Sequence, residues 1–472
     1  MFERLKSGTE IDGFRVGERT HAGVMNDIFR VTRPDTDAPM IMKVPRVGPN
    51  FPDESLIGYE TEAMILPALS GPHVPRFVAA GDLTKTPYLV TEWIEGENLE
   101  DMVKRGPLPA AEISRVGAAL ADALHGLHLQ DAVHLDLKPE NVILRPGGEA
   151  VLIDLGFAFH ARFPDLLAEE KRFAAGSAPY ISPEQVLGTR SDSRSDIFSL
   201  GVVLYEMATG RLPFGSPQTV AGLRDRLWLD PVPPRSRAAS LPAWLQEIIL
   251  RCLEPDAEER YQSAAHVAFD LRHPDQVALT ARATKSRQAG ILAQARRWWR
   301  ARGWRAGLHG RPNALVGTAP VIMLAVDTTH PDDPRQPELR RAARQILSFP
   351  EEFRLICVSV THGPPAFEGP EVSQSVSGIQ LEHLIRLRHW VEPLQLPSQR
   401  LSLHVIHSSN PAGALLDFAR RNNVSLIVLG APGPHERSLA WWRSVASGVT
   451  ANAPCSVYVV RIPEGGRAAE AD

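Results

Sequence analysis

A single run of eight residues in the first third of the chain limits the folds that the chain can adopt. Residues His134–Asn141 read HLDLKPEN, and Asp154 follows thirteen residues later within the sequence IDLG. Two carboxylates and a side-chain amide at this spacing can hold Mg²⁺ and a substrate hydroxyl group together. An isolated Asp in a loop is usually a helix cap or a solvated charge, but a run of this type followed by Asp-Leu-Gly reverses that expectation. The pattern therefore predicts a fold that brings Asp136, Asn141 and Asp154 into one site for phosphoryl transfer.

Length and composition exclude several classes of protein. The 472 residues suggest about three domains, or two larger ones and a connector. A formal net charge of −4 excludes a global basic field for nucleic acid, so no nucleic-acid partner is expected. The three cysteines are far apart without a CxxC spacing, which argues against a disulfide framework and fits a reducing compartment. Because no apolar run reaches the roughly 18–20 residues of a membrane span and no signal segment opens the chain, we expect a soluble, cytoplasmic protein without a transmembrane segment.

Residues 10–272 change from strand-like to helix-like patterns along the chain. This order predicts a small β-rich lobe at 10–94 followed by a larger α-rich lobe at 95–272. The strand-like runs are Phe14–Val16, Ile28–Val31, Met40–Val44, Phe77–Ala80 and Tyr88–Trp93, and the helical patterns include Tyr59–Leu69, Ile113–Leu129 and Ile197–Ala208.

This region resembles the eukaryotic-like serine/threonine protein kinases of bacteria, because several of their motifs occur in order. The resemblance implies a bilobal α+β kinase fold, with ATP and Mg²⁺ as cofactors and proteins bearing Ser or Thr as substrates. It also implies that Asp136 orients the substrate hydroxyl, that Lys138 neutralises the γ-phosphate, and that Asn141 and Asp154 bind Mg²⁺. The sequence GSAPYISPE at 176–184 resembles the end of a kinase activation segment. Kinases of small molecules generally lack that segment, so phosphorylation of a metabolite or an aminoglycoside is a weaker hypothesis for this chain.

The resemblance extends to the residues that would hold ATP. Lys43 ends an apolar run and would grip the α- and β-phosphates, paired with a helical Glu about twenty residues later. Glu62 fits that position best, and Glu60 is its rival. Backbone groups from Glu92 to Ile94 would pair with adenine at the hinge between the lobes.

Three further residues are expected to brace the site rather than to act in its chemistry. Glu184, at the end of the activation segment, should pair with Arg260. Asp196 should brace the catalytic loop.

The phosphate-binding loop departs from the kinase pattern. The expected G-x-G-x-x-G is HAGVMN here, with His21, Gly23 and Asn26 at the three glycine positions. Glycine permits a positive φ and a close approach of the backbone to phosphate, and Asn visits the left-handed region more readily than other non-glycine residues. We expect weakened binding of ATP. The replacements at His21 and Asn26 favour the alternative of a pseudokinase that binds nucleotide and scaffolds stress signalling.

The activation segment shows a second departure. Leu135 replaces the Arg that usually precedes the catalytic Asp, and residues 155–176 contain no Ser, Thr or Tyr. The segment thus lacks both a phosphate acceptor and the Arg that would receive the phosphate. We hypothesise that activation-loop phosphorylation does not switch this chain.

Residues 318–463 alternate regularly between strand-like and helix-like stretches, which predicts βαβ units and a parallel sheet. The expected strands are Val321–Val326, Leu355–Val360, Leu401–Ile406, Leu426–Leu429 and Val457–Ile462, and the expected helices lie near 336–348, 378–392, 411–422 and 438–452. The segment resembles the universal stress protein family, with its closest match in the runs LIVLG at 426–430 and APCSV at 453–457. The resemblance implies a doubly wound α/β domain with a parallel five-stranded sheet.

Ligands of such sheets bind beyond the carboxyl ends of the strands. A second nucleotide site would use Asp327 after the first strand, with Gly430, Gly433, Arg443 and Ser444 near the fourth. The ATP-binding members of the family read G-x2-G-x9-G-S/T, and Arg443 stands where they have the third Gly. We expect Ser444 to open a helix whose N–H groups could hold phosphate, although tight turns alone also require Gly. The alternative role is a homodimer that pairs through Val457–Ile462.

Residues 273–317 form a basic linker rich in Trp and Arg. Between 274 and 313, nine basic residues stand against the single acid Asp275. Such a segment can contact an anionic membrane or nucleic acid. A solvated connector whose Trp side chains pack on a neighbouring domain is the plainer reading, and docking against acidic parts of the chain is the other.

Overall fold

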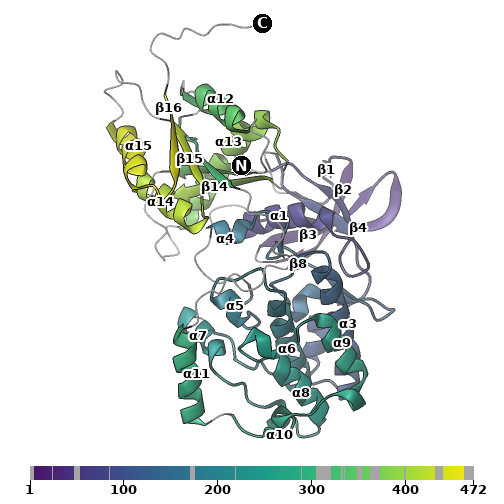
Figure 1. Ribbon diagram of the computed structural model, residues 1–472. Helices are drawn as coiled ribbons and strands as arrows, with labels where there is room; N and C mark the ends of the chain where they lie inside the picture. The colour runs from purple at the N-terminus through teal and green to yellow at the C-terminus, as the bar shows by residue number, and fades with distance from the viewer. Residues whose placement is uncertain are drawn as a thin grey trace.

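The structure is a computed structural model, and it describes residues 5–461 with gaps at 24, 47–53, 84, 171–175, 218, 289, 304–319, 331–332, 334, 348–352, 362–372, 398–399 and 431–439. The chain forms a small β-rich lobe, a larger helical lobe and a C-terminal α/β domain (Figure 1). Among the described helices, none is long and apolar enough to cross a membrane.

The small lobe is a six-stranded antiparallel sheet with the order β1-β2-β3-β4-β6-β5. Alternate side chains of each strand point to opposite faces, so Met40 and Met42 of β4 are buried while Lys43 points toward the other face. Helix α1 (Glu54–Ile65) lies between β4 and β5 along the chain. The strands are β1 (Glu10–Ile11), β2 (Phe14–Ala22), β3 (Asn26–Arg33), β4 (Thr36–Pro45), β5 (Phe77–Ala80) and β6 (Leu89–Glu92).

The large lobe packs helices around α6 (Arg194–Thr209), which is buried along nearly its whole length. Such all-round burial is expected of a helix that is hydrophobic on every face. The other helices are α2 (Leu99–Lys104), α3 (Ala110–His128), α4 (Leu166–Glu170), α5 (Pro183–Val186), α7 (Val220–Arg224), α8 (Ala243–Cys252) and α9 (Ala264–Arg272). Short strands carry the catalytic loop: β7 (Glu97–Asn98), β8 (Ala132–Val133), β9 (Val142–Leu144), β10 (Ala150–Leu152) and β11 (Phe159–His160).

The C-terminal domain is a parallel five-stranded sheet with the order β14-β13-β12-β15-β16. Helices α12 and α13 pack on one face and α14 and α15 on the other, each against its own apolar cluster. Because both faces are covered, the central strands are almost continuously apolar. The elements are β12 (Val321–Ala325), α12 (Arg335–Leu347), β13 (Arg354–Thr361), α13 (Ser373–Val391), β14 (Leu401–His407), α14 (Pro411–Arg421), β15 (Leu426–Gly430), α15 (Ala440–Asn452) and β16 (Ser456–Val460).

The expected strands of both regions are present within a few residues of their predicted bounds. The linker, in contrast, is helical over α10 (Ala281–Thr284) and α11 (Ile291–Gly303). Lys285 and Arg297 both pair with the buried Asp230 of the large lobe, whereas the side chain of Trp299 is 67% exposed. The described part of the linker is therefore held by charge on the large lobe rather than by buried Trp.

Candidate active site

Lys43 of β4 lies between two carboxylates at the junction of the lobes. Its Nζ donates to Glu62 Oε2 at 2.5 Å and to Asp154 Oδ1 at 2.7 Å. Burial alone would lower the pKa of Lys43, but the charges of Asp154 and Glu62 outweigh it and raise the pKa above its usual value. Glu62 is thus the partner of Lys43, and the rival Glu60 pairs with Arg388 instead.

The catalytic loop holds the carboxylate of Asp136 through several donors. Ser177 N donates to Asp136 Oδ1 at 2.6 Å, and Asn141 Nδ2 donates to Asp136 Oδ2 at 3.1 Å. Lys138 Nζ donates to Ser177 Oγ at 2.8 Å and lies 3.4 Å from Asp136 Oδ2. Asp136, Lys138 and Asn141 are therefore fixed to one another and to the end of the activation segment.

Asp154 lies next to the catalytic loop, because the preceding residue, Ile153, donates its backbone N–H to Asn141 O at 2.9 Å. Burial would raise the pKa of Asp154, but Lys43, and more weakly Lys138, hold the pKa of this carboxyl below its usual range. An ionised Asp154 at neutral pH suits a divalent cation, which prefers oxygen ligands. In the described part of the chain, the bonds to the Asp154 carboxylate all end on Oδ1, and Asn141 gives its Nδ2 to Asp136. Asp154 Oδ2 and Asn141 Oδ1 remain as the oxygens that fit Mg²⁺.

Asp196 of α6 fixes the backbone of the catalytic loop through hydrogen bonds. Its Oδ1 accepts from Leu135 N at 2.8 Å, and its Oδ2 accepts from His134 N and His128 Nε2, each at 2.8 Å. Burial would raise the pKa of Asp196, but these hydrogen bonds and the neighbouring histidines hold it below its usual range. Leu135 adopts a left-handed backbone with φ 62°, which a side chain other than Gly tolerates only when its surroundings fix it. The expected bracing role of Asp196 is present.

Arg260 closes the second structural pair. Its guanidinium donates to Glu184 Oε1 at 2.7 Å and to Oε2 at 3.1 Å. The Arg260 side chain is fully buried, so this two-pronged pair ties the end of the activation segment to the large lobe. The expected pairing of Glu184 with Arg260 is confirmed.

The phosphate-binding loop does not use the conformations that the sequence suggested. Neither Gly23 nor Asn26 has a positive φ, so the argument from left-handed backbone was wrong for this loop. Gly23 instead meets close neighbours, because an added Cβ would lie 3.1 Å from Asn26 O and 3.3 Å from His21 Nε2. The ring of His21 thus lies over the loop.

The hinge follows β6 as expected. Glu92 is the last residue of β6, and its carboxylate Oε1 accepts from Arg145 NH2 at 3.1 Å. Ile94 is buried. Trp93 N donates to Pro39 O at 2.8 Å, so its amide faces the sheet. Pairing of the Glu92 and Ile94 backbone with adenine stays a prediction.

Two contributors to the site were not assigned from the sequence. Ser177 was noted only as part of the GSAPYISPE run at the end of the activation segment, yet it links Lys138 to Asp136. Gln185 donates its Nε2 to Leu135 O at 2.8 Å, and its Oε1 accepts from Ser182 N at 3.0 Å in a capping box. The sequence Ser-Pro-Glu-Gln at 182–185 is a capping-box signature, so it could have pointed to Gln185.

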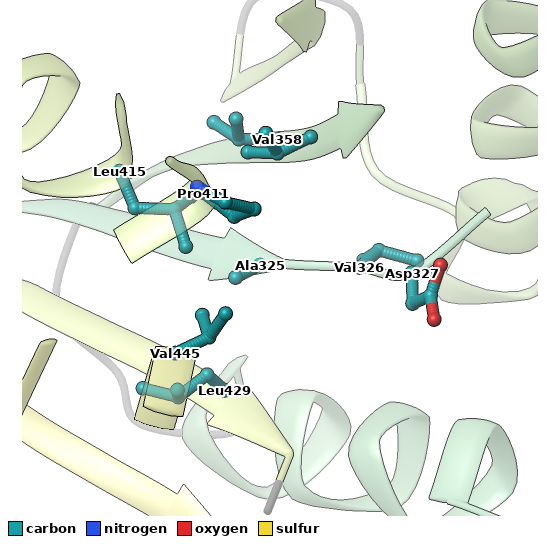
Figure 2. Close-up of a pocket in the computed structure, with 9 residues that line it drawn as sticks. Ala325, Val326, Asp327, Val358, Pro411, Leu415, Leu429 and Val445 are labelled. Atoms are coloured by element: carbon teal, nitrogen blue, oxygen red, sulfur yellow. The ribbon is translucent and has the colours of Figure 1, made fainter. Parts of the chain in front are cut away.

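The expected second nucleotide site falls at the carboxyl ends of the strands of the C-terminal domain (Figure 2). Asp327 is buried just beyond β12 and accepts from Thr329 N at 2.8 Å. It borders a small, mostly apolar pocket formed by Ala325, Val326, Val358, Val360, Pro411, Leu415, Leu429 and Val445.

The other residues of this second site are only partly described. Gly430 ends β15, and Gly433 lies outside the described residues. Helix α15 begins at Ala440, so Arg443 and Ser444 stand in its interior. The expectation that Ser444 opens the helix was wrong.

Comparison with known families agrees with this architecture. Residues 15–270 match the protein kinase domain family, and residues 320–461 match the universal stress protein family. The kinase match covers more than half of the chain, and the chain belongs to the protein kinase family. It carries a universal stress protein domain after the kinase domain.

Among curated proteins, the chain is 33% identical over 220 residues to a probable serine/threonine-protein kinase of Clostridium perfringens, covering 46% of this chain and 32% of the relative. It is 36% identical over 220 residues to serine/threonine-protein kinase pkn2 of Myxococcus xanthus, covering 45% and 26%. It is 30% identical over 265 residues to PknB of Mycobacterium tuberculosis, covering 55% and 42%. The matches thus span less than half of each of these relatives. The crystal structure of the Mycobacterium tuberculosis PknI kinase domain aligns with 57% of this chain and 99% of that chain, at 21% identity and a TM-score of 0.46.

Proposed function

We propose that this chain transfers the γ-phosphate of ATP to Ser or Thr hydroxyls of proteins. The observation that carries the proposal is the pair of charge clusters: Lys43 with Glu62 and Asp154, next to Asp136 with Asn141 and Lys138. Phosphoryl transfer needs positioning and electrostatic stabilisation more than covalent chemistry. Buried charged side chains that are hydrogen-bonded to one another supply both the positioning and the electrostatic stabilisation.

Each residue has a distinct part in the proposed transfer. Lys43, held by Glu62, binds the α- and β-phosphates, and Asp136 accepts a hydrogen bond from the substrate hydroxyl and orients it for in-line attack. Lys138 offsets the charge that develops on the transferred group. Asp154 and Asn141 would hold Mg²⁺, and the bound cation would supply positive charge that offsets the charge of the phosphates.

Replacing Asp136 with Asn tests this function. Asp136→Asn keeps the shape of the side chain and removes its charge, so we expect phosphate transfer from labelled Mg-ATP to fall about 10²- to 10⁴-fold. Asp101→Asn, an exposed change on α2, is the matched control and should transfer at the wild-type rate. Equal transfer by the wild type and Asp136→Asn would contradict the assignment of Asp136.

A pseudokinase scaffold is the second candidate, and the phosphate-binding loop favours it. His21 replaces the first glycine, and its ring lies against Gly23, where phosphate would approach. Binding of ATP without transfer, by the wild type as well as by Asp136→Asn, would support the scaffold instead of the enzyme.

The C-terminal domain senses a nucleotide or forms a homodimer in this proposal. The place of Asp327, just beyond the carboxyl end of β12, supports the first role, because ligands of parallel sheets bind at this edge. The edge position of β16 supports the second, because an edge strand offers unpaired backbone groups and Tyr458 is 46% exposed. Sedimentation of the wild type and Tyr458→Asp separates the two roles, since only a dimer through β16 would dissociate.

We also propose that the protein resides in a reducing compartment such as the cytoplasm, because Cys252, Cys357 and Cys455 are all free thiols.

A further inference from the structure

The universal stress protein domain lies against the kinase domain beside α1 and α4 (Figure 1). Arg388 of α13 donates to Glu60 of α1 at 2.5 Å. His404 of β14 lies 2.5 Å from Glu169 of α4, and Arg354 of β13 also pairs with Glu169. The two kinase helices are thus each held by charged groups of the C-terminal domain.

Apolar contacts join the same surfaces. Leu384 of α13 and Val405 of β14 belong to the hydrophobic cluster of the kinase domain, together with Leu56 and Tyr59 of α1. The Glu169 and His404 side chains are 4% and 1% exposed. Docking removes the Glu169 carboxylate from water, and its pairs with His404 and Arg354 offset that desolvation cost. Loss of either partner would therefore weaken the docked arrangement.

Helix α1 connects this interface to the active site. Glu60 and Glu62 are two residues apart, and two residues turn a helix by about 200°. One side of α1 therefore presents Glu62 to Lys43, and the other presents Glu60 to Arg388. Any rotation or outward shift of α1 would break the Lys43–Glu62 pair.

Helix α4 connects the interface to the activation segment. Along the chain, α4 falls between Asp154 and Glu184, within the activation segment. Its residues Leu166 and Leu167 pack against Ile57 of α1. In many kinases an activation-segment phosphate orders this region through Arg side chains. Here residues 155–176 contain no hydroxyl side chain, and Leu135 stands before Asp136.

We propose that the universal stress protein domain is an intramolecular activator that clamps α1 and α4 through Arg388, His404 and Arg354, in place of an activation-segment phosphate. This inference rests on the proposed kinase function. The clamp keeps Glu62 on Lys43, so release of the C-terminal domain lowers catalysis without any change in a catalytic residue.

Charge reversal at the interface tests the proposal in the full chain. Arg388→Glu places a negative charge against Glu60, so we expect kcat/KM for phosphate transfer to fall on the order of tenfold, the usual size of coupling between two sites. Backbone hydrogen exchange across α1 should speed up in the same variant. The swap Glu60→Arg with Arg388→Glu should recover both readouts. Arg420→Glu, an exposed change on α14 whose Arg pairs with Asp417, is the matched control and should behave as wild type.

The two readouts separate the possible failures. Faster exchange in α1 with unchanged or higher activity would overturn the activator role, and unchanged exchange would overturn the clamp itself. If the wild type transfers no phosphate, the proposed function fails and the activator role fails with it, while the exchange data still decide whether the domain holds α1.

Discussion

At the scale of single residues, the site depends on two side chains in left-handed backbone positions. Leu135 and Asp154 have φ values of 62° and 66°. Leu135 directly precedes Asp136, and Asp154 is itself a proposed Mg²⁺ ligand. The grouping of Asp136 with Asn141 could be predicted, because the spacing of these residues is a property of the sequence. Their roles in catalysis stay a prediction. The argument from positive φ was wrong for Gly23 and Asn26, whereas the close approach of this backbone to phosphate stays a prediction.

Asp196 is the residue whose contribution to stability should depend on pH. Its folded pKa is held below the usual value, so its contribution is fully present above the unfolded pKa of about 4 and is lost as pH falls through the folded value. Asp196→Asn should lower the free energy of unfolding of the large lobe by about 3 kcal/mol at pH 7. The difference from the wild type should shrink below about pH 4. Hydrogen exchange across α3 and α6 at several pH values measures the difference in the free energy of unfolding between the wild type and Asp196→Asn. A difference that grows on acidification would contradict the stabilising role of the ionised Asp196.

At the scale of elements, the periodicity of the sequence predicted the positions of the strands closely. Contacts with distant parts of the chain determine the helices that the periodicity did not predict. The buried pattern of Ile197–Ala208 predicted a helix, and α6 extends it to Arg194–Thr209. The basic linker had no such signal. Its helices α10 and α11 depend on partners such as Asp230, which lies far away in the sequence.

Gly201 of α6 tests how tightly the helices of the large lobe pack. An added Cβ would lie 2.6 Å from Cys252 Cβ of α8, too close for two carbon atoms. Gly201→Ala should therefore destabilise the large lobe by about 1–3 kcal/mol, the usual cost of overpacking. Gly290→Ala is the control, since nothing lies within 4 Å of its added Cβ. Thermal unfolding of both variants measures the effect, and equal midpoints would contradict the close packing of α6 on α8.

At the scale of the whole molecule, the sequence predicted two folded regions but not how they meet. The contacts of Arg388 with Glu60 and of His404 with Glu169 join residues more than two hundred positions apart. No local pattern marks such pairs, because each residue alone reads as a solvated charge or a strand residue. These contacts decide which Glu pairs with Lys43. Glu62 does so from one side of α1, and Glu60 pairs with Arg388 on the other side.

Transfer to protein hydroxyls tests the central claim most directly. The full chain is incubated with Mg-ATP and a generic basic protein, and phosphorylated positions are located by mass spectrometry for the wild type and for Asp136→Asn. The account predicts phosphate on Ser and Thr with the wild type and a loss of about 10²-fold or more with Asp136→Asn. Bound ATP with no phosphate on any protein, for both forms, would contradict the enzyme and leave a nucleotide-binding scaffold.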